Sequence, residues 1–263
     1  MVNAESVTPS QSFLDYFQWN KQDVNPNIPN EIFDDLINSS IKSFRHRAFA
    51  YSFYYLCSCL YYNAKYGTIP LYNLYSLQLI EMLYGNRKPI NYITKRNGVL
   101  DQMGYTASEN DFPITCNTEN GFLMDFSMYS DLPKEQRDQM NVPRNFICKR
   151  PVKAFYRNPH DVYYTGTFFE FEKTHRIDFR IFIKCIADSR YGFEDFYVYA
   201  FLFVFEQFIN SKSIVYKNYI ASSLNLSMRT LNRILSNLTK LNLIKINDDK
   251  GFKYTICKNP TKD

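Results

Sequence analysis

Three cations near the carboxyl end of the chain, Arg229, Arg233 and Lys240, have the spacing of one helix face. At about 100° per residue they lie within about 40° of one another, almost opposite the apolar residues of the same segment. Side chains of this kind can donate to phosphate oxygens, and an arginine can donate two hydrogen bonds to a guanine. The chemistry that they predict is recognition of a polyanion, not bond cleavage.

Polar uncharged residues flank this cationic stripe. A helix is expected from Met228 to about Asn242, with Ser227 placed to cap its first turn. Asparagine can pair with adenine, and hydroxyl groups can contact phosphate. The predicted DNA contacts on and beside this helix are Ser227, Arg229, Thr230, Arg233, Ser236, Asn237 and Lys240.

Two further helices are expected before this one. The first, Glu194–Asn210, has a broad apolar surface, and the second, Val215–Leu224, has Ser213 in position to cap it. A tight turn, Asn225-Leu226-Ser227, leads into the helix from Met228. Two short strands should follow it as a hairpin, Leu243–Asn247 and Phe252–Cys257.

The segment SLNLSMRTLNRILSNLTKLNLIKI resembles the winged helix-turn-helix superfamily of bacterial regulators and replication proteins. The resemblance covers about Phe196–Cys257. It implies that the helix from Met228 is the recognition helix, and that Lys250 and Lys253 lie on or near the wing. The chain departs from the pattern at the wing tip, where Asp248-Asp249 would repel a phosphate.

The charge of the chain is concentrated at this end. From Ser211 onward there are ten basic and three acidic residues, a net charge of +7, although the whole chain carries only +5. Residues 1–210 therefore sum to −2. No acid occurs from Ser211 to Asn247, whereas a merely solvated face normally mixes both signs. A local positive field of this kind favours a polyanionic partner.

The rest of the chain predicts an α+β protein. Residues 1–30 are a polar arm, 31–143 a helical domain with a β-hairpin, 144–190 a β-rich connection, and 191–263 the winged helix-turn-helix domain. An aromatic helix followed by a second helix and a hairpin occurs in both halves. The N-terminal domain is therefore predicted to be a second, divergent winged-helix-like unit.

The elements expected before residue 191 follow from apolar periodicity and from turn residues. The expected helices are Glu31–Lys65, Ile69–Tyr84 and Asp178–Ala187. The expected strands are Phe112–Cys116 paired with Phe122–Met128, then Asn145–Tyr156 and Val162–Glu172.

Two other basic groups lie in this half. One consists of Arg87, Lys88, Lys95 and Arg96, which are either a second DNA contact or a basic surface loop. The other, Arg45-His46-Arg47, could touch phosphates or could simply mark the polar start of a buried helix.

No catalytic, metal or cofactor site is predicted. Glu170 and Glu172 share a strand face near His160-Asp161, but a metal-dependent nuclease needs a convergent acidic cluster. There is no phosphate-binding loop of the GxxxxGK[ST] type, and the six cysteines form no CxxC pair. The chain is expected not to be an enzyme.

Sequence-specific binding of double-stranded DNA in transcription regulation is the function that these features favour. A plasmid or phage replication initiator that binds origin repeats is an alternative, since two tandem winged helices would suit it. A protein-interaction module is another. The chain has no apolar run long enough to span a bilayer and no secretory signal, so a cytoplasmic protein is expected. A homodimer is plausible because paired half-sites would add affinity.

Overall fold

The computed structural model describes residues 14–20, 22–66, 84, 88–119, 122–140, 142–143, 146–153, 173–208, 216–247 and 252–257. Within these residues the chain is an α+β protein, with helices and four two-stranded antiparallel sheets. The predicted fold class is confirmed at this level. None of the described helices is both long and apolar enough to cross a bilayer.

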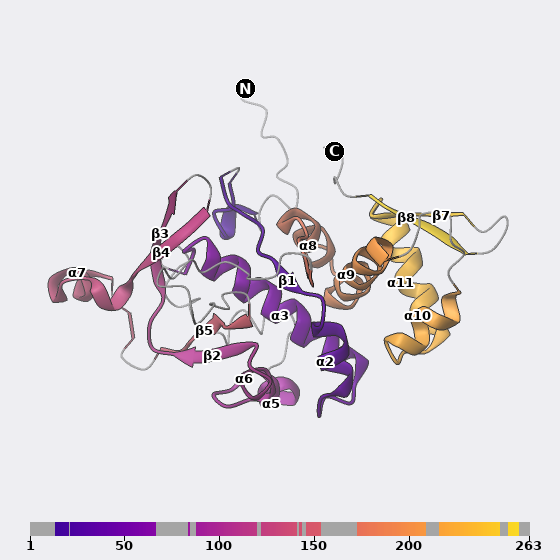
Figure 1. The fold of residues 1–263 in the computed structure, drawn as a ribbon, viewed down its shortest axis with the longest axis horizontal. Helices are drawn as coiled ribbons and strands as arrows, with labels where there is room; N and C mark the ends of the chain where they lie inside the picture. Colours follow the sequence, from indigo (N-terminus) through magenta and orange to yellow (C-terminus); the bar gives the residue numbers. More distant parts are fainter. Residues whose placement is uncertain are drawn as a thin grey trace, which may run out of the picture.

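Two aromatic helices, α3 (Phe44–Tyr62) and α9 (Phe193–Phe208), form the centre of the molecule (Figure 1). Every residue of α3 from Arg47 to Tyr61 is buried, as expected for a helix whose apolar residues lie on nearly every face. The rings of Tyr55 and Phe196 lie 4.8 Å apart between the two helices. A single hydrophobic core continues from this contact into both ends of the chain.

The single long helix predicted from Glu31 to Lys65 is wrong in one respect, because the chain breaks it into α2 (Ile32–Asn38) and α3. Ser39 is extended, and its hydroxyl donates to the carbonyl oxygen of Leu36 at 2.7 Å and accepts from the amide of Ile41 at 3.1 Å. Serine competes in this way for helical hydrogen bonds. The break lets α2 turn back and cover α3.

The sheets are short and lie around the two central helices. The predicted N-terminal hairpin is confirmed as β3 (Pro113–Glu119) paired with β4 (Phe122–Met128). Two other sheets join distant parts of the chain. They are β1 (Ile28–Pro29) with β6 (Thr174–His175), and β2 (Thr106–Glu109) with β5 (Cys148–Pro151).

Several predicted elements are covered only in part. Strand β5 lies inside the run predicted from Asn145 to Tyr156, whereas the predicted strand Val162–Glu172 lies outside the described residues. Of the helix predicted at Ile69–Tyr84, only Tyr84 is described. The remaining short helices are η2 (Lys88–Ile90), α5 (Asn91–Thr94), α6 (Val99–Gln102), η3 (Tyr129–Asp131) and α7 (Lys134–Gln139).

The elements predicted for the last part of the chain are present, with shifted ends. After α8 (Phe179–Ile186) and α9 come α10 (Lys217–Ser223), α11 (Met228–Lys240), β7 (Ile244–Asn247) and β8 (Lys253–Ile256). Strands β7 and β8 are antiparallel neighbours. The predicted cap at Ser213 is wrong, because α10 begins only at Lys217 and Tyr216 occupies its N-cap position.

His175 is a buried histidine in this framework. Its ring lies between the Tyr51 hydroxyl at 2.7 Å and the Asn30 side-chain oxygen at 2.9 Å. Burial lowers the pKa of His175 to about 3. Since the unfolded chain binds this proton near pH 6.5, the stabilisation is complete above that pH and is lost as the pH falls towards 3.

Lowering the pH from 7 to 5 is therefore expected to remove about 2 kcal/mol of stability through His175. Urea unfolding of the wild type and of His175→Gln at the two pH values measures this, because the variant should lack that part of the loss. The contribution of Asp195 to stability has the opposite pH dependence. Burial raises its pKa to about 6, so its contribution is present below about pH 3.8 and is lost as the pH rises through 6. Equal losses in the two proteins would contradict the assignment to His175.

Candidate nucleic-acid interface

Helix α11 separates its residues into a buried face and an exposed face. Leu231, Ile234, Leu235 and Leu238 are buried in the core. The exposed face contains Arg229, Asn232, Arg233, Ser236, Thr239 and Lys240. Asn232 is not among the predicted contacts, although its position on the helical wheel, about 40° from Ser236 on the side facing away from Arg229, places it next to the predicted stripe.

The start of α11 is fixed by its predicted cap. The Ser227 hydroxyl accepts a hydrogen bond from the amide of Thr230 at 3.2 Å and lies 2.9 Å from the Thr230 hydroxyl. The turn before it has Asn225 at φ 48, a left-handed conformation that asparagine tolerates. Ser227 and Thr230 therefore satisfy each other in the described structure, and their first role is to hold the helix end.

A buried arginine of α3 fastens this turn to the rest of the molecule. Arg47 is 1% exposed, and its guanidinium donates to the carbonyl oxygens of Leu224 at 3.0 Å and Asn225 at 3.3 Å. It also donates to the carbonyl oxygens of Ile41 and Lys42. The sequence leaves two interpretations of the Arg45-His46-Arg47 segment, phosphate contact or the polar start of a buried helix. For Arg47 the second holds, because its guanidinium is buried and bonded within the fold.

The acidic first turn of α9 contacts two of the predicted DNA-binding residues. Glu194 forms an ion pair with Arg233 at 2.7 Å, and the Asn237 amide donates to Asp195 at 2.9 Å. Asp195 is buried and also accepts from the amide of Gly192. The sequence shows no acid near Arg233, because these two acids lie about forty residues earlier and reach α11 only through the fold.

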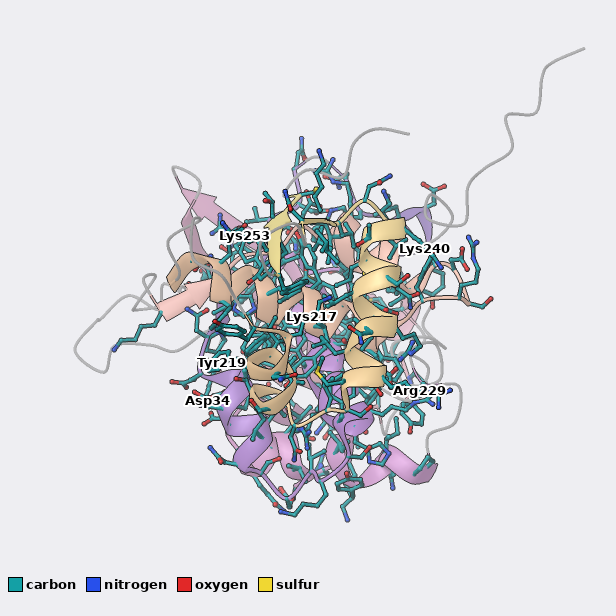
Figure 2. The ribbon with its side chains drawn as sticks, turned by 90° about the vertical axis from the view of Figure 1, so that its right-hand side faces the viewer. Asp34, Lys217, Tyr219, Arg229, Lys240 and Lys253 are labelled. Atoms are coloured by element: carbon teal, nitrogen blue, oxygen red, sulfur yellow. The ribbon has the colours of Figure 1, made fainter. Side chains whose placement is uncertain are left out.

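The two cations at the ends of α11 are placed differently. Within the described part of the chain, Arg229 and Lys240 have no acidic side chain within ion-pair distance. Both side chains are exposed. In Figure 2 they lie at opposite ends of α11, along the outer edge of the face that α10, α11 and the β7–β8 hairpin present to the viewer.

The hairpin after α11 carries one of the two predicted wing lysines. Lys253 starts β8 opposite Asn247 and is half-buried (Figure 2). Lys250 and the acidic pair Asp248-Asp249 lie outside the described residues. A third lysine, Lys217 of α10, lies 4.8 Å above the Phe252 ring and so covers the base of the hairpin.

Comparison of the chain with protein-family models, curated proteins and solved structures finds no match. The geometry of the chain itself is therefore what supports a function.

The second predicted contact group is only partly described. Lys95 and Arg96 are exposed in the loop after α5, and Arg96 donates to the Asn110 side chain at 3.0 Å. Arg87 lies outside the described residues, as does the side chain of Lys88. The loop adjoins the start of α3, because Tyr92 of α5 is hydrogen-bonded to His46 at 2.9 Å.

The catalytic candidates of the sequence, and possible metal-binding groups, can be examined only within the described residues. The candidates Glu170, Glu172 and His160-Asp161 lie outside them. Within the described ranges there is no group of three or more histidine, cysteine, aspartate or glutamate side chains that could hold a metal ion.

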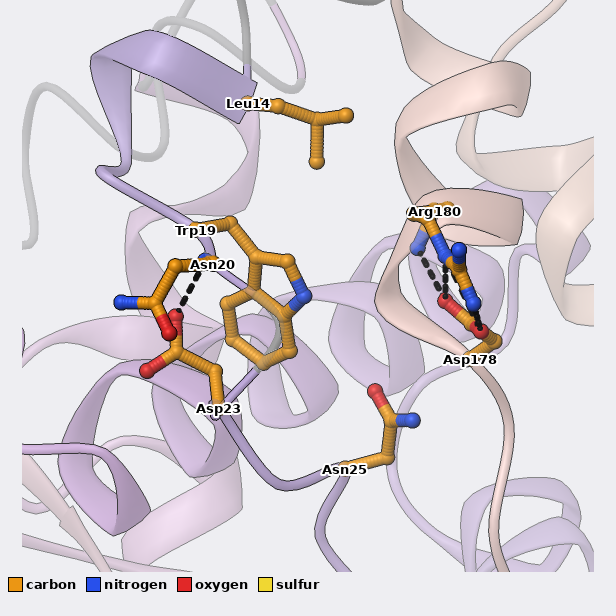
Figure 3. A pocket seen from close by; sticks show the side chains of 7 residues that line it. All are labelled: Leu14, Trp19, Asn20, Asp23, Asn25, Asp178 and Arg180. Carbon is orange, nitrogen blue, oxygen red and sulfur yellow. Dashed lines mark hydrogen bonds and ion pairs between the residues drawn. The ribbon is translucent and has the colours of Figure 1, made fainter. Parts of the chain in front are cut away.

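A pocket of about 300 Å³ lies beside Trp19, between the N-terminal segment and the start of α8 (Figure 3). Its carboxylates already have partners. Asp23 pairs with Lys65 at 3.0 Å, and Asp178 pairs with Arg180. The side-chain oxygen of Asn25 accepts from the amide of Phe179. The polar groups that line this pocket thus stabilise the fold and do not converge on a ligand.

Proposed function

We propose that this protein binds double-stranded DNA with α11 in the major groove, as a sequence-specific regulator of transcription. The observation that carries the proposal is the composition of the exposed face of α11. It presents two arginines, a lysine, an asparagine, a serine and a threonine, and no acid, while the opposite face is fixed in the core. These side chains are the ones that read base edges and bind phosphates.

The surrounding elements support the assignment of a winged helix-turn-helix. Helix α10, the turn at Asn225 and α11 stand in the order of a helix-turn-helix, and the antiparallel strands β7 and β8 follow in the position of a wing. A recognition helix must present its first turns to the groove, and the Ser227 cap and the Arg47 contacts hold that end of α11 in place.

The contacts from α9 divide the predicted DNA-binding residues into two groups. The ion pair between Arg233 and Glu194 is about half-exposed on the arginine side, and pairs of this kind contribute about 0 to 1 kcal/mol. A phosphate or a guanine can therefore displace Glu194. Asn237 is half-buried against Asp195 and is assigned to stability. Base recognition is then assigned to Arg229, Asn232, Arg233 and Ser236.

Selection of binding sites from random duplex DNA, followed by sequencing, tests the proposal. The wild type is expected to enrich one motif. Arg229→Ala should weaken binding to that motif about 5- to 150-fold, because a bidentate arginine–guanine contact is worth about 1 to 3 kcal/mol. Arg229→Ala/Arg233→Ala should abolish the enrichment. Paired half-sites about one helical turn apart would support a homodimer.

A matched control is Lys134→Ala, an exposed cation on α7 at the other end of the molecule (Figure 1). It should leave the motif and the affinity unchanged. Absence of any enriched motif at low salt would reject the proposal. Enriched sites that lie as repeats beside a replication origin would instead favour the replication initiator.

One observation favours a protein-binding role as a second candidate. Tyr216 and Tyr219, at the start of α10, are 73% and 53% exposed, and large aromatic side chains are enriched in protein interfaces. This role predicts that Tyr219→Ala impairs the function in the cell while duplex binding stays intact.

A further inference from the structure

We propose that Lys42, just before α3, and Arg45, in its first turn, are phosphate-binding residues that extend the proposed DNA-binding surface of α11 onto the N-terminal half of the chain. This inference rests on the proposed function and adds a second element to the site. It also divides the Arg45-His46-Arg47 segment by role, since Arg47 holds the fold while Arg45 faces the partner.

Lys42 is held beside the turn that precedes α11. The guanidinium of Arg47 bridges the two segments. It donates to the Lys42 carbonyl oxygen at 2.8 Å and to the Leu224 carbonyl oxygen at 3.0 Å. The backbone of Lys42 and the backbone of the turn are therefore separated by no more than one planar group. The Lys42 side chain is exposed at this position.

Arg45 is held beside the start of α9, the helix whose first turn also contacts α11. Its guanidinium lies 4.9 Å from the centre of the Tyr84 ring and 5.7 Å from that of Phe193. Phe193 is followed directly by Glu194, whose carboxylate binds Arg233. Arg45 and Arg233 are thus anchored to consecutive residues at the start of α9, one from each half of the molecule.

The arrangement of Arg45 suits a phosphate ligand. Stacking on aromatic rings orients a guanidinium but leaves its N–H donors available, and the Arg45 side chain is exposed. The two carboxylates in the first turn of α9 already have partners, since Glu194 pairs with Arg233 and Asp195 accepts from Asn237. Burial and the charge of Arg45 lower the pKa of the adjacent His46, which adds no charge at neutral pH.

The α10 side of this face carries both signs of charge, with Asp34 as an acid and Lys253 as a cation. In Figure 2 Asp34 lies on the α10 side of this face, across from Arg229. The cations Lys42, Arg45, Arg229 and Arg233 all belong to the neighbourhood of α11 and the start of α9. A duplex whose groove holds α11 would place its phosphate backbone over this side, where contacts position the protein without reading sequence.

The test compares salt dependence of duplex binding by the full chain. Lys42→Ala/Arg45→Ala should lower affinity for the enriched motif and for an unrelated duplex by the same factor. Each phosphate contact releases about 0.9 counterion, so two contacts are worth roughly 30-fold at 0.15 M salt, and the slope of log affinity against log salt should fall by about 2. The single variant Arg45→Lys, which keeps the positive charge, should retain most of the slope of log affinity against log salt. Thermal unfolding of each variant verifies that it is folded.

The matched control is Lys134→Ala/Arg137→Ala, which also removes two cations but on α7, far from α11 in Figure 1. If Lys42→Ala/Arg45→Ala binds like this control while Arg229→Ala is impaired, the extension onto α3 is wrong and the proposed function stands. A loss confined to the enriched motif would also overturn it, because that outcome would make these residues base-reading. Failure of the wild type to bind any duplex overturns both proposals.

Discussion

Replacement of Arg47 by methionine is expected to lower the free energy of unfolding by about 3 kcal/mol. The substitution keeps an unbranched apolar stem but leaves four backbone carbonyl oxygens without the charged donor that now satisfies them. Hydrogen bonds to a charged group contribute about 1.5 to 3 kcal/mol each, and part of that is returned because the guanidinium no longer has to be buried. Urea unfolding measures the change.

A second readout follows from where those carbonyls lie. Leu224 and Asn225 form the turn before α11, so hydrogen exchange of the amides from Asn225 to Ser227 should accelerate in Arg47→Met more than that of amides in α8. The control is Arg176→Met, which removes an exposed arginine whose guanidinium donates to the Asn27 side chain, and it should cost less than about 0.5 kcal/mol. A loss for Arg47→Met no larger than that of the control would show that Arg47 does not fasten the turn.

The second large effect is expected at Asp101. Its carboxylate lies 2.7 Å from the ammonium of Lys149, which is buried, and it accepts from the hydroxyls of Thr106 and Ser108 and from the amide of Asn97. Asp101→Ala leaves the Lys149 charge buried without its counter-ion, and this type of loss costs about 3 to 5 kcal/mol. Chemical unfolding of the variant gives the value.

A double variant separates the charge from the packing. Asp101→Ala/Lys149→Met also removes the buried ammonium, so it should regain a large part of the stability that Asp101→Ala loses. Glu109→Ala is the control, because its partner Arg150 is more than a third exposed and such a pair is worth about 0 to 1 kcal/mol. If the double variant were less stable than Asp101→Ala, the buried charge would not be the source of the loss.

The same carboxylate shapes the loop of Lys95 and Arg96, which the sequence predicts as either a second DNA contact or a basic surface loop. Lys149 donates to the carbonyl oxygen of Lys95, and Asp101 accepts from the amide of Asn97. The exposed side chains of Lys95 and Arg96 are therefore carried on a loop that this buried pair holds in shape. A weakened loop in Asp101→Ala would affect any contact that these two residues make.

The course of α11 could be predicted from the sequence because its apolar residues recur with the helical period and Ser227 marks its start. The C-terminal hairpin was predictable in the same way, from two apolar runs separated by turn residues. These are local signals, in which the residues that determine the structure are neighbours in the chain. The helix break at Ser39 was missed because the apolar residues on both sides of it fit one continuous helical pattern.

The partners of the predicted site residues could not be predicted. Arg233 meets Glu194, which lies 39 residues earlier, and Arg47 meets Leu224, which lies 177 residues later. Spacing along the chain carries no information about such pairs, since only the packing of α3 and α9 brings them together. The sequence therefore located the exposed stripe of α11 but not the acids beside it.

Helix α9 has a consequence for how the protein can be divided. One side of it packs on the N-terminal half, where Tyr197 lies 5.5 Å from Phe33. Its other side binds the last strand, because Tyr254 donates to the carbonyl oxygen of Leu202 and Glu206 accepts from the amide of Ile256. A fragment that begins near residue 191 would expose the aromatic side of α9 to water. The C-terminal part of the chain is thus expected not to fold autonomously, and the whole chain should melt as one cooperative unit.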